Sequence, residues 1–162
     1  MDYIWLNFDE YYINQGDPGF ADIRFKNNTT IKSYGCGVCC AAMIVCKTLD
    51  LTQTGDKQAV IKKVIADATN ADGLLTYSNV TYDGVVFKFI KNTDYMTSFD
   101  LCQPSICKLN GHFVLVNGFD SNQNAYEAYL IKDPGASANR NLQQPMQKYG
   151  SAIKDTIALR YA

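Results

Sequence analysis

The strongest candidate for a reactive residue is a cysteine between two glycines, in Gly35-Cys36-Gly37. This segment leads directly into a run of small and apolar residues typical of a buried helix. The glycines permit a close backbone approach. The first turn of a helix presents unpaired N–H groups with partial positive charge, and such a position lowers the pKa of a thiol. Cys36 is therefore expected to be a catalytic nucleophile.

The neighbouring cysteines leave two other interpretations open. Cys36 and Cys39 have the C-x-x-C form of a dithiol redox site, although no apolar strand precedes them as in thioredoxin-like sites. A zinc site could be drawn from Cys36, Cys39, Cys102 and Cys107, but the second pair has C-x4-C spacing. We favour the nucleophile, and expect the cysteines other than Cys36 to be small buried hydrophobic residues.

The single histidine of the chain, His112, begins an apolar run that predicts a strand. A hairpin with a four-residue turn over 121–124 sets Val116 opposite Tyr129 and His112 opposite Asp133. Opposed residues of an antiparallel pair have Cβ atoms roughly 4.5 to 5.5 Å apart on one face. Asp133 can then accept from one imidazole nitrogen and leave the other to act on a thiol.

The elements that must position these side chains fall into two blocks. A buried helix is predicted over 36–49, an amphipathic helix over 54–69 and a short helix over 79–90. Short apolar runs separated by turns predict strands at 105–109, 112–119, 125–132 and 156–161. Helices followed by strands with tight turns indicate an α+β fold with an antiparallel sheet.

Composition limits the classes of partner. A chain of 162 residues is expected to form a single domain over 1–162, and a formal charge of −1 without a basic cluster argues against nucleic acid as a partner. No stretch approaches the roughly 20 apolar residues of a membrane span. The N-terminus lacks the features of a signal peptide, so we expect synthesis in the cytosol and free thiols. No metal or nucleotide cofactor is expected.

Four segments in this order, 15–18, 35–37 with 41–43, 104–120 and 131–135, resemble the bacteriocin-processing peptidase-like family of papain-like cysteine peptidases. This family includes the double-glycine leader peptidases and free-standing or phage-lysin relatives. The chain departs from the pattern at 38–40, where the family more often has proline, threonine and serine or similar residues. These positions lie beyond the nucleophile.

The resemblance implies a papain-like fold, with an N-terminal nucleophile helix packed on a C-terminal antiparallel sheet. It implies that Cys36 is the nucleophile, His112 the general base and acid, and Asp133 the residue that orients His112. It also implies that Gln15 donates to the oxyanion, beside the backbone N–H of Cys36. No cofactor is implied, and the reaction is hydrolysis of a peptide or amide bond.

The substrate expected from this resemblance is a peptide of the cell wall, as for phage or bacterial lysins, and such an enzyme would be released or virion-associated. Double-glycine leader processing is one alternative. A non-catalytic papain-fold binding or structural module is the other, although a binder has no need of four catalytic residue types.

Overall fold

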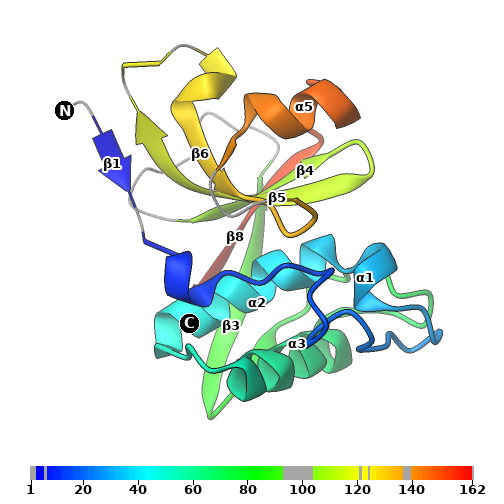
Figure 1. Cartoon of the computed structure of the whole chain (residues 1–162). Coiled ribbons are helices and arrows are strands. Elements are labelled where there is room, and N and C mark those ends of the chain that lie inside the picture. Colours follow the sequence, from blue (N-terminus) through cyan, green and yellow to red (C-terminus); the bar gives the residue numbers. More distant parts are fainter. Residues whose placement is uncertain are drawn as a thin grey trace.

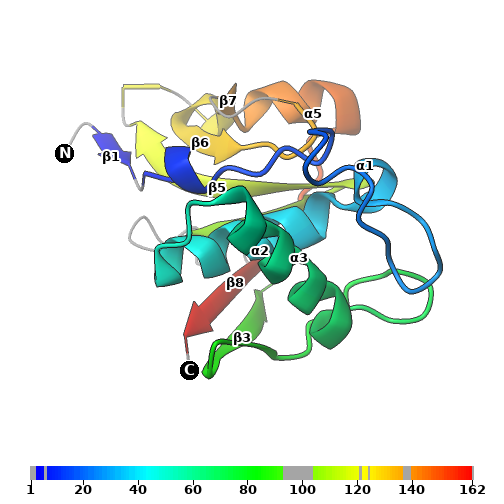
Figure 2. The same cartoon turned by 60° about the horizontal axis from the view of Figure 1, so that its bottom comes forward.

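A computed structural model of the chain describes residues 3–5, 7–92, 104–120, 122–123, 125–136 and 140–161. Antiparallel strands form one sheet with helices on both faces (Figures 1 and 2), which confirms the expected mixture of helix and antiparallel sheet. The strands are β1 (Tyr3–Trp5), β2 (Val80–Tyr82), β3 (Val85–Asn92), β4 (Ser105–Leu109), β5 (His112–Asp120), β6 (Tyr129–Lys132), β7 (Arg140–Asn141) and β8 (Asp155–Tyr161). Their order is β2-β3-β8-β4-β5-β6-β7, and β1 pairs with β5.

The helices follow the same chain order. They are η1 (Asp9–Tyr11), α1 (Ile31–Tyr34), α2 (Cys36–Leu49), α3 (Thr54–Ala68), η2 (Ala125–Ala128) and α5 (Gln143–Tyr149). The predicted helix over 36–49 is α2, with the same bounds, and the predicted helix over 54–69 is α3, which ends one residue earlier.

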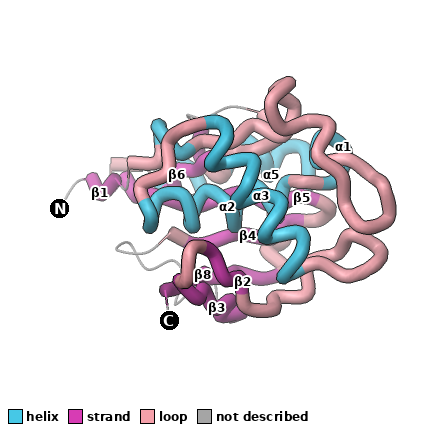
Figure 3. The backbone as a smooth tube through the Cα atoms, turned by 90° about the horizontal axis from the view of Figure 1, so that it is seen from below, coloured by secondary structure: helices cyan, strands magenta, loops and turns pink. Residues whose placement is uncertain are grey.

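Helix α2 is buried on every side, because all residues from Gly37 to Cys46 lie in the interior. Helix α3 runs beside α2 (Figure 3) and buries an apolar face that includes Val60, Ile61 and Val64 in the same core. Helix α2 is capped by Asp50, whose φ of 55° is left-handed and whose N–H donates to the carbonyls of Cys46 and Lys47. The buried surroundings and the C-terminal cap hold the helix that carries Cys36 in place.

The opposite face of the sheet has a smaller core. Alternate residues of β4 and β5, such as Cys107 and Val114, pack there with Leu142 and Met146 next to and within α5. The central strands therefore lie between α2 and α3 on one face and α5 on the other, as Figure 2 shows. His112 shares the α5 face, because it is two residues from Val114 along β5.

Two predicted elements are wrong. The helix predicted over 79–90 is the hairpin of β2 and β3, because Asp83 and Gly84 both have positive φ, 50° and 77°, and form the two-residue turn typical of Asp-Gly. The strand predicted over 125–132 begins as the 3-10 helix η2, and only Tyr129–Lys132 is a strand.

The predicted register of the β5–β6 hairpin is also wrong. Val116 pairs with Ile131, and Tyr129 pairs with Phe119, because the register shifts between Val116 and Gly118 and η2 lengthens the connection. Next to His112, the register differs from the predicted one by two residues. A shift of two keeps every side chain on its predicted face of the sheet, so Asp133, just beyond the end of β6, remains within reach of His112.

Within the described part of the chain, no helix has the length and apolar character needed to cross a membrane.

Candidate active site

Cys36 lies at the first position of α2, and no side chain caps this helix end. The N–H of Cys39 is the first to reach a carbonyl within the helix, that of Gly35, at 2.8 Å. The preceding N–H groups of the turn are those that a helix start leaves without intrahelical acceptors. Their partial positive charge stabilises negative charge that develops next to the helix start.

A glycine at position 37 lets the helix start approach the sheet closely. A Cβ there would lie 2.7 Å from Cδ1 of Leu75 and 3.0 Å from Cδ2 of Phe113. Since Phe113 follows His112 in β5, this contact brings the start of α2 against the beginning of the strand that carries His112. The close approach explains how residues 76 positions apart in the chain meet.

His112 is hydrogen-bonded to Asp133 and lines the same clefts as Cys36. Nε2 is 2.8 Å from Oδ1 of Asp133, and both side chains are buried, with 6% and 2% exposed. Cys36 is the second group that acts on the imidazole, because its interaction with the ring raises the pKa of His112. Because Nε2 is committed to Asp133, Nδ1 is the nitrogen that can exchange a proton with the thiol.

Asp133 is itself held from several directions. Its Oδ1 accepts the N–H of Gly135 at 2.9 Å, and its backbone carbonyl accepts the hydroxyl of Tyr12 at 2.6 Å. A side chain at 135 would crowd the imidazole, because a Cβ there would lie 3.1 Å from Cε1 of His112. The carboxylate is therefore fixed in the position that orients the imidazole.

The pKa of His112 shows how these contacts balance. Burial lowers it, since the charged imidazolium loses solvent, but hydrogen bonds to Asp133 and Cys36 and the negative charges of both groups raise it to about 9. At neutral pH the imidazole is accordingly protonated beside the thiol. That is the state in which a thiolate and an imidazolium form a pair.

Tyr149, the last residue of α5, stacks on the imidazole. The ring centroids of His112 and Tyr149 are 4.4 Å apart, with an angle of 18° between the planes. An aromatic face favours a nearby cation and keeps water from one side of the ring. No local sequence pattern indicates this contact, because it depends on the packing of a helix that periodicity did not predict.

Gln15 lies at the site, but its amide is engaged with the backbone. Nε2 donates to the carbonyls of Ile31 and Lys32 at 3.2 and 2.9 Å, which uses both of its hydrogens. The reversed amide would place an oxygen against these two carbonyls, so the orientation is fixed by chemistry. Its Oε1 is buried and has no hydrogen-bond partner among the described residues. Donation to an oxyanion would require the amide to turn, and this role of Gln15 stays a prediction.

Two clefts meet at Cys36 and His112. The smaller, of about 350 Å³, is lined by Gln15, Gly135 and Tyr149, and the larger, of about 580 Å³, extends over the helix start toward Leu74 and Phe113. Cys36 and His112 line both. A chain bound across the clefts would pass directly over the thiol.

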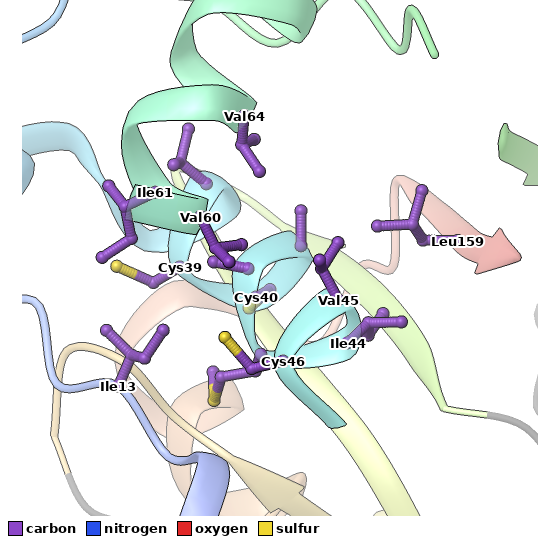
Figure 4. Packing of buried hydrophobic residues seen from close by; sticks show 14 of the residues in the cluster. Ile13, Cys39, Cys40, Ile44, Val45, Cys46, Val60, Ile61, Val64 and Leu159 are labelled. Atoms are coloured by element: carbon purple, nitrogen blue, oxygen red, sulfur yellow. The ribbon is translucent and has the colours of Figure 1, made fainter. Parts of the chain in front are cut away.

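The other described cysteines are buried, as Figure 4 shows for Cys39, Cys40 and Cys46 among the apolar residues of α2 and α3. Burial raises the pKa of Cys46 and of Cys107 to about 12 and raises the pKa values of Cys39 and Cys40 further. Redox chemistry through Cys36 and Cys39 would have to expose a sulfur that is fully enclosed.

The zinc interpretation finds no cluster in the described residues, where no three side chains of His, Cys, Asp or Glu are placed to share a metal ion. Cys102, one of the four ligands considered for it, lies outside the described residues.

In comparisons with known proteins, no family model and no curated protein matches the chain.

Proposed function

We propose that this chain is a cysteine peptidase or amidase that hydrolyses a peptide bond through a covalent acyl-enzyme. Cys36 is the nucleophile, His112 the general base and acid, and Asp133 the residue that orients His112. One observation supports this above the others: the partly exposed Cys36 at the start of α2 lines the same clefts as the only histidine of the chain, whose Nε2 is held by a buried carboxylate.

Two half-reactions follow from these roles. The Cys36 thiolate attacks the substrate carbonyl carbon, a C–S bond forms, and the electron pair of the C=O bond moves to oxygen. When the tetrahedral intermediate collapses, the C–N bond breaks and the imidazolium of His112 gives its Nδ1 proton to the leaving amine. Water then loses a proton to His112 and attacks the thioester, and the C–S bond breaks to release the acid and the thiolate.

The negative oxygen formed in each half-reaction needs neutral donors. The first-turn N–H groups of α2 lie beside Cys36 and suit this role. Gln15 would join them if binding of the substrate carbonyl turned its amide away from the carbonyls of Ile31 and Lys32.

The papain-like fold implied by the resemblance is part of this proposal. It is supported by three features: the nucleophile begins a buried helix, that helix packs against an antiparallel sheet, and the histidine begins one strand while the aspartate follows the next. A cell-wall peptide and a double-glycine leader are the two substrates that the resemblance implies, and the lining of the clefts bears on the choice of substrate.

Thiol alkylation tests the proposal before any substrate is known. At pH 7, iodoacetamide should modify Cys36 first, as located by mass spectrometry, and His112→Ala should slow that reaction about 30-fold, because an ordinary thiol is only a few per cent thiolate at this pH. Cys36→Ala is the control that removes the fast phase. Equal reactivity of Cys36 and the remaining cysteines, or no effect of His112→Ala in a folded variant, would overturn the nucleophile assignment.

Substrate is then sought with purified peptidoglycan, a double-glycine leader peptide and a denatured protein, each compared with the Cys36→Ala variant. New peptide termini that appear with the parent protein and not with the Cys36→Ala variant identify a hydrolase. Normal Cys36 reactivity without cleavage of any of the three would instead favour the non-catalytic module.

A further inference from the structure

Three large hydrophobic side chains are the most exposed in the described part of the chain: Tyr34, Leu74 and Ile90, with 67%, 63% and 48% exposed. Two of these, Tyr34 and Leu74, line the larger cleft beside Cys36. Single exposed apolar residues are common on protein surfaces, but apolar residues gathered at a cleft mark a binding surface. Their position beside the nucleophile associates them with substrate.

The floor of the same cleft is apolar as well. Leu75, Tyr77 and Phe113 are partly buried against the main core and line the cleft from below the rim. Glycine at 37 extends this floor to the nucleophile, since any side chain there would collide with Leu75 and Phe113. With a volume of about 580 Å³, the cleft has room for a large side chain.

The charged residues of the larger cleft indicate a second feature of the group that binds there. Lys108 extends its Nζ over the ring of Phe113, 5.7 Å from the centroid, and has no ion-pair partner among the described residues. Lys91, at the same cleft, is paired with Asp155 at 3.4 Å. Asp72 is the acidic residue that lines the cleft. The ammonium of Lys108 is therefore the group left to attract a carboxylate.

The chemistry of the acyl transfer indicates which part of a substrate enters this cleft. The leaving amine must lie by the ring of His112, which Tyr149 covers, and the predicted oxyanion donor Gln15 lies on that same side. Tyr149 and Gln15 both line the smaller cleft. The remaining substituent of the tetrahedral carbon, the acyl chain, is then directed toward Tyr34 and Leu74.

Resting on the proposed function, we propose that the larger cleft binds the acyl portion of the substrate, a peptide segment with a bulky aromatic or branched apolar side chain and a neighbouring carboxylate. A Gly-Gly terminus would leave the apolar surface uncovered and Lys108 unpaired. The structure thus favours an apolar, acidic peptide over a double-glycine leader.

Peptidyl chloromethyl ketones test this directly, because they deliver an acyl-side peptide to the thiol without requiring turnover. Capped tripeptides ending in Gly-Gly, Phe-Gly or Gly-Phe, each preceded by Glu or by Gln, would be compared by their second-order rate of Cys36 alkylation. The better Phe probe should react about 10-fold faster than the Gly-Gly probe, since a buried apolar group contributes discrimination of that order. The Glu probes should exceed the Gln probes by about threefold.

Variants assign the preference to the cleft. Tyr34→Ala and Leu74→Ala should each reduce the advantage of Phe, and Lys108→Gln should remove the advantage of Glu. Ile90→Ala is a matched control, because Ile90 is also exposed but does not line the cleft. Equal rates for Phe and Gly-Gly probes, or an equal loss in the Ile90→Ala variant, would overturn the inference.

Iodoacetamide separates the two levels of the account. If it alkylates Cys36 rapidly while all peptidyl probes react alike, the specificity of the cleft is wrong and the nucleophile stands. If Cys36 shows no enhanced reactivity toward iodoacetamide either, the proposed function itself fails.

Discussion

Cysteines at the two ends of the first turn of helix α2 have opposite properties. Cys36, at the first position, is partly exposed and lines the same clefts as His112, whereas Cys39 and Cys40 are fully buried and have pKa values raised far above the ordinary thiol value. The difference arises from position alone, because the helix start meets a cleft and the following turn meets the core. Thiol chemistry in this chain therefore depends on where the helix begins.

The strongest way to test this comparison is to remove one cysteine from each environment. Cys36→Ser should lower hydrolysis by at least about 10³-fold with the melting temperature unchanged, since it removes the nucleophile and little packing. Cys40→Ala should keep activity but reduce the free energy of unfolding by roughly 1 kcal/mol, as is usual for a core substitution. Steady-state kinetics and thermal unfolding measure both. A Cys40→Ala variant that folds normally but is inactive would contradict the comparison.

Asp133 offers an intermediate effect, because its charge and its hydrogen bond can be removed separately. Asp133→Ala should lower hydrolysis on the order of 10²-fold, and Asp133→Asn less, since the amide oxygen can still accept from Nε2. Removing the negative charge lowers the pKa of His112 from about 9, so the alkaline limb of the rate profile should move to lower pH in both variants. An unchanged alkaline limb would show that His112 does not control the reaction.

Tyr149 should have the smallest effect. Tyr149→Ala removes the ring stacked on His112 and should slow hydrolysis about threefold and lower the pKa of His112 slightly, because the imidazolium loses an aromatic neighbour. Tyr149→Phe keeps the stack and should match the parent protein. If Phe and Ala variants are impaired equally, the hydroxyl rather than the stack is responsible.

Local sequence signals predicted the parts of the site that depend on local structure. The glycines around Cys36 and the apolar run after it predicted α2 with its observed bounds. His112 and Asp133 meet although the predicted register was wrong, because a shift of two residues keeps both on one face and a carboxylate at the strand end can reach diagonally.

Features that depend on tertiary packing could not be predicted in this way. The irregularity between Val116 and Gly118 has no marker in the sequence. The contact of Tyr149 with His112 and the larger cleft both require elements far apart in the chain to be placed against one another. By contrast, the Asp83-Gly84 turn did carry a local hairpin signal, and the predicted helix over 79–90 overlooked it.

The central claim is that Cys36 and His112 form one acid–base pair, and a single-residue NMR titration tests it most directly. With one histidine in the chain, the imidazole resonances report His112 without assignment ambiguity. The pKa should be about 9 in the parent protein and lower in Cys36→Ala, because the hydrogen bond and the charge of Cys36 both raise it. A pKa near the ordinary 6.5, identical in the two proteins, would contradict the account.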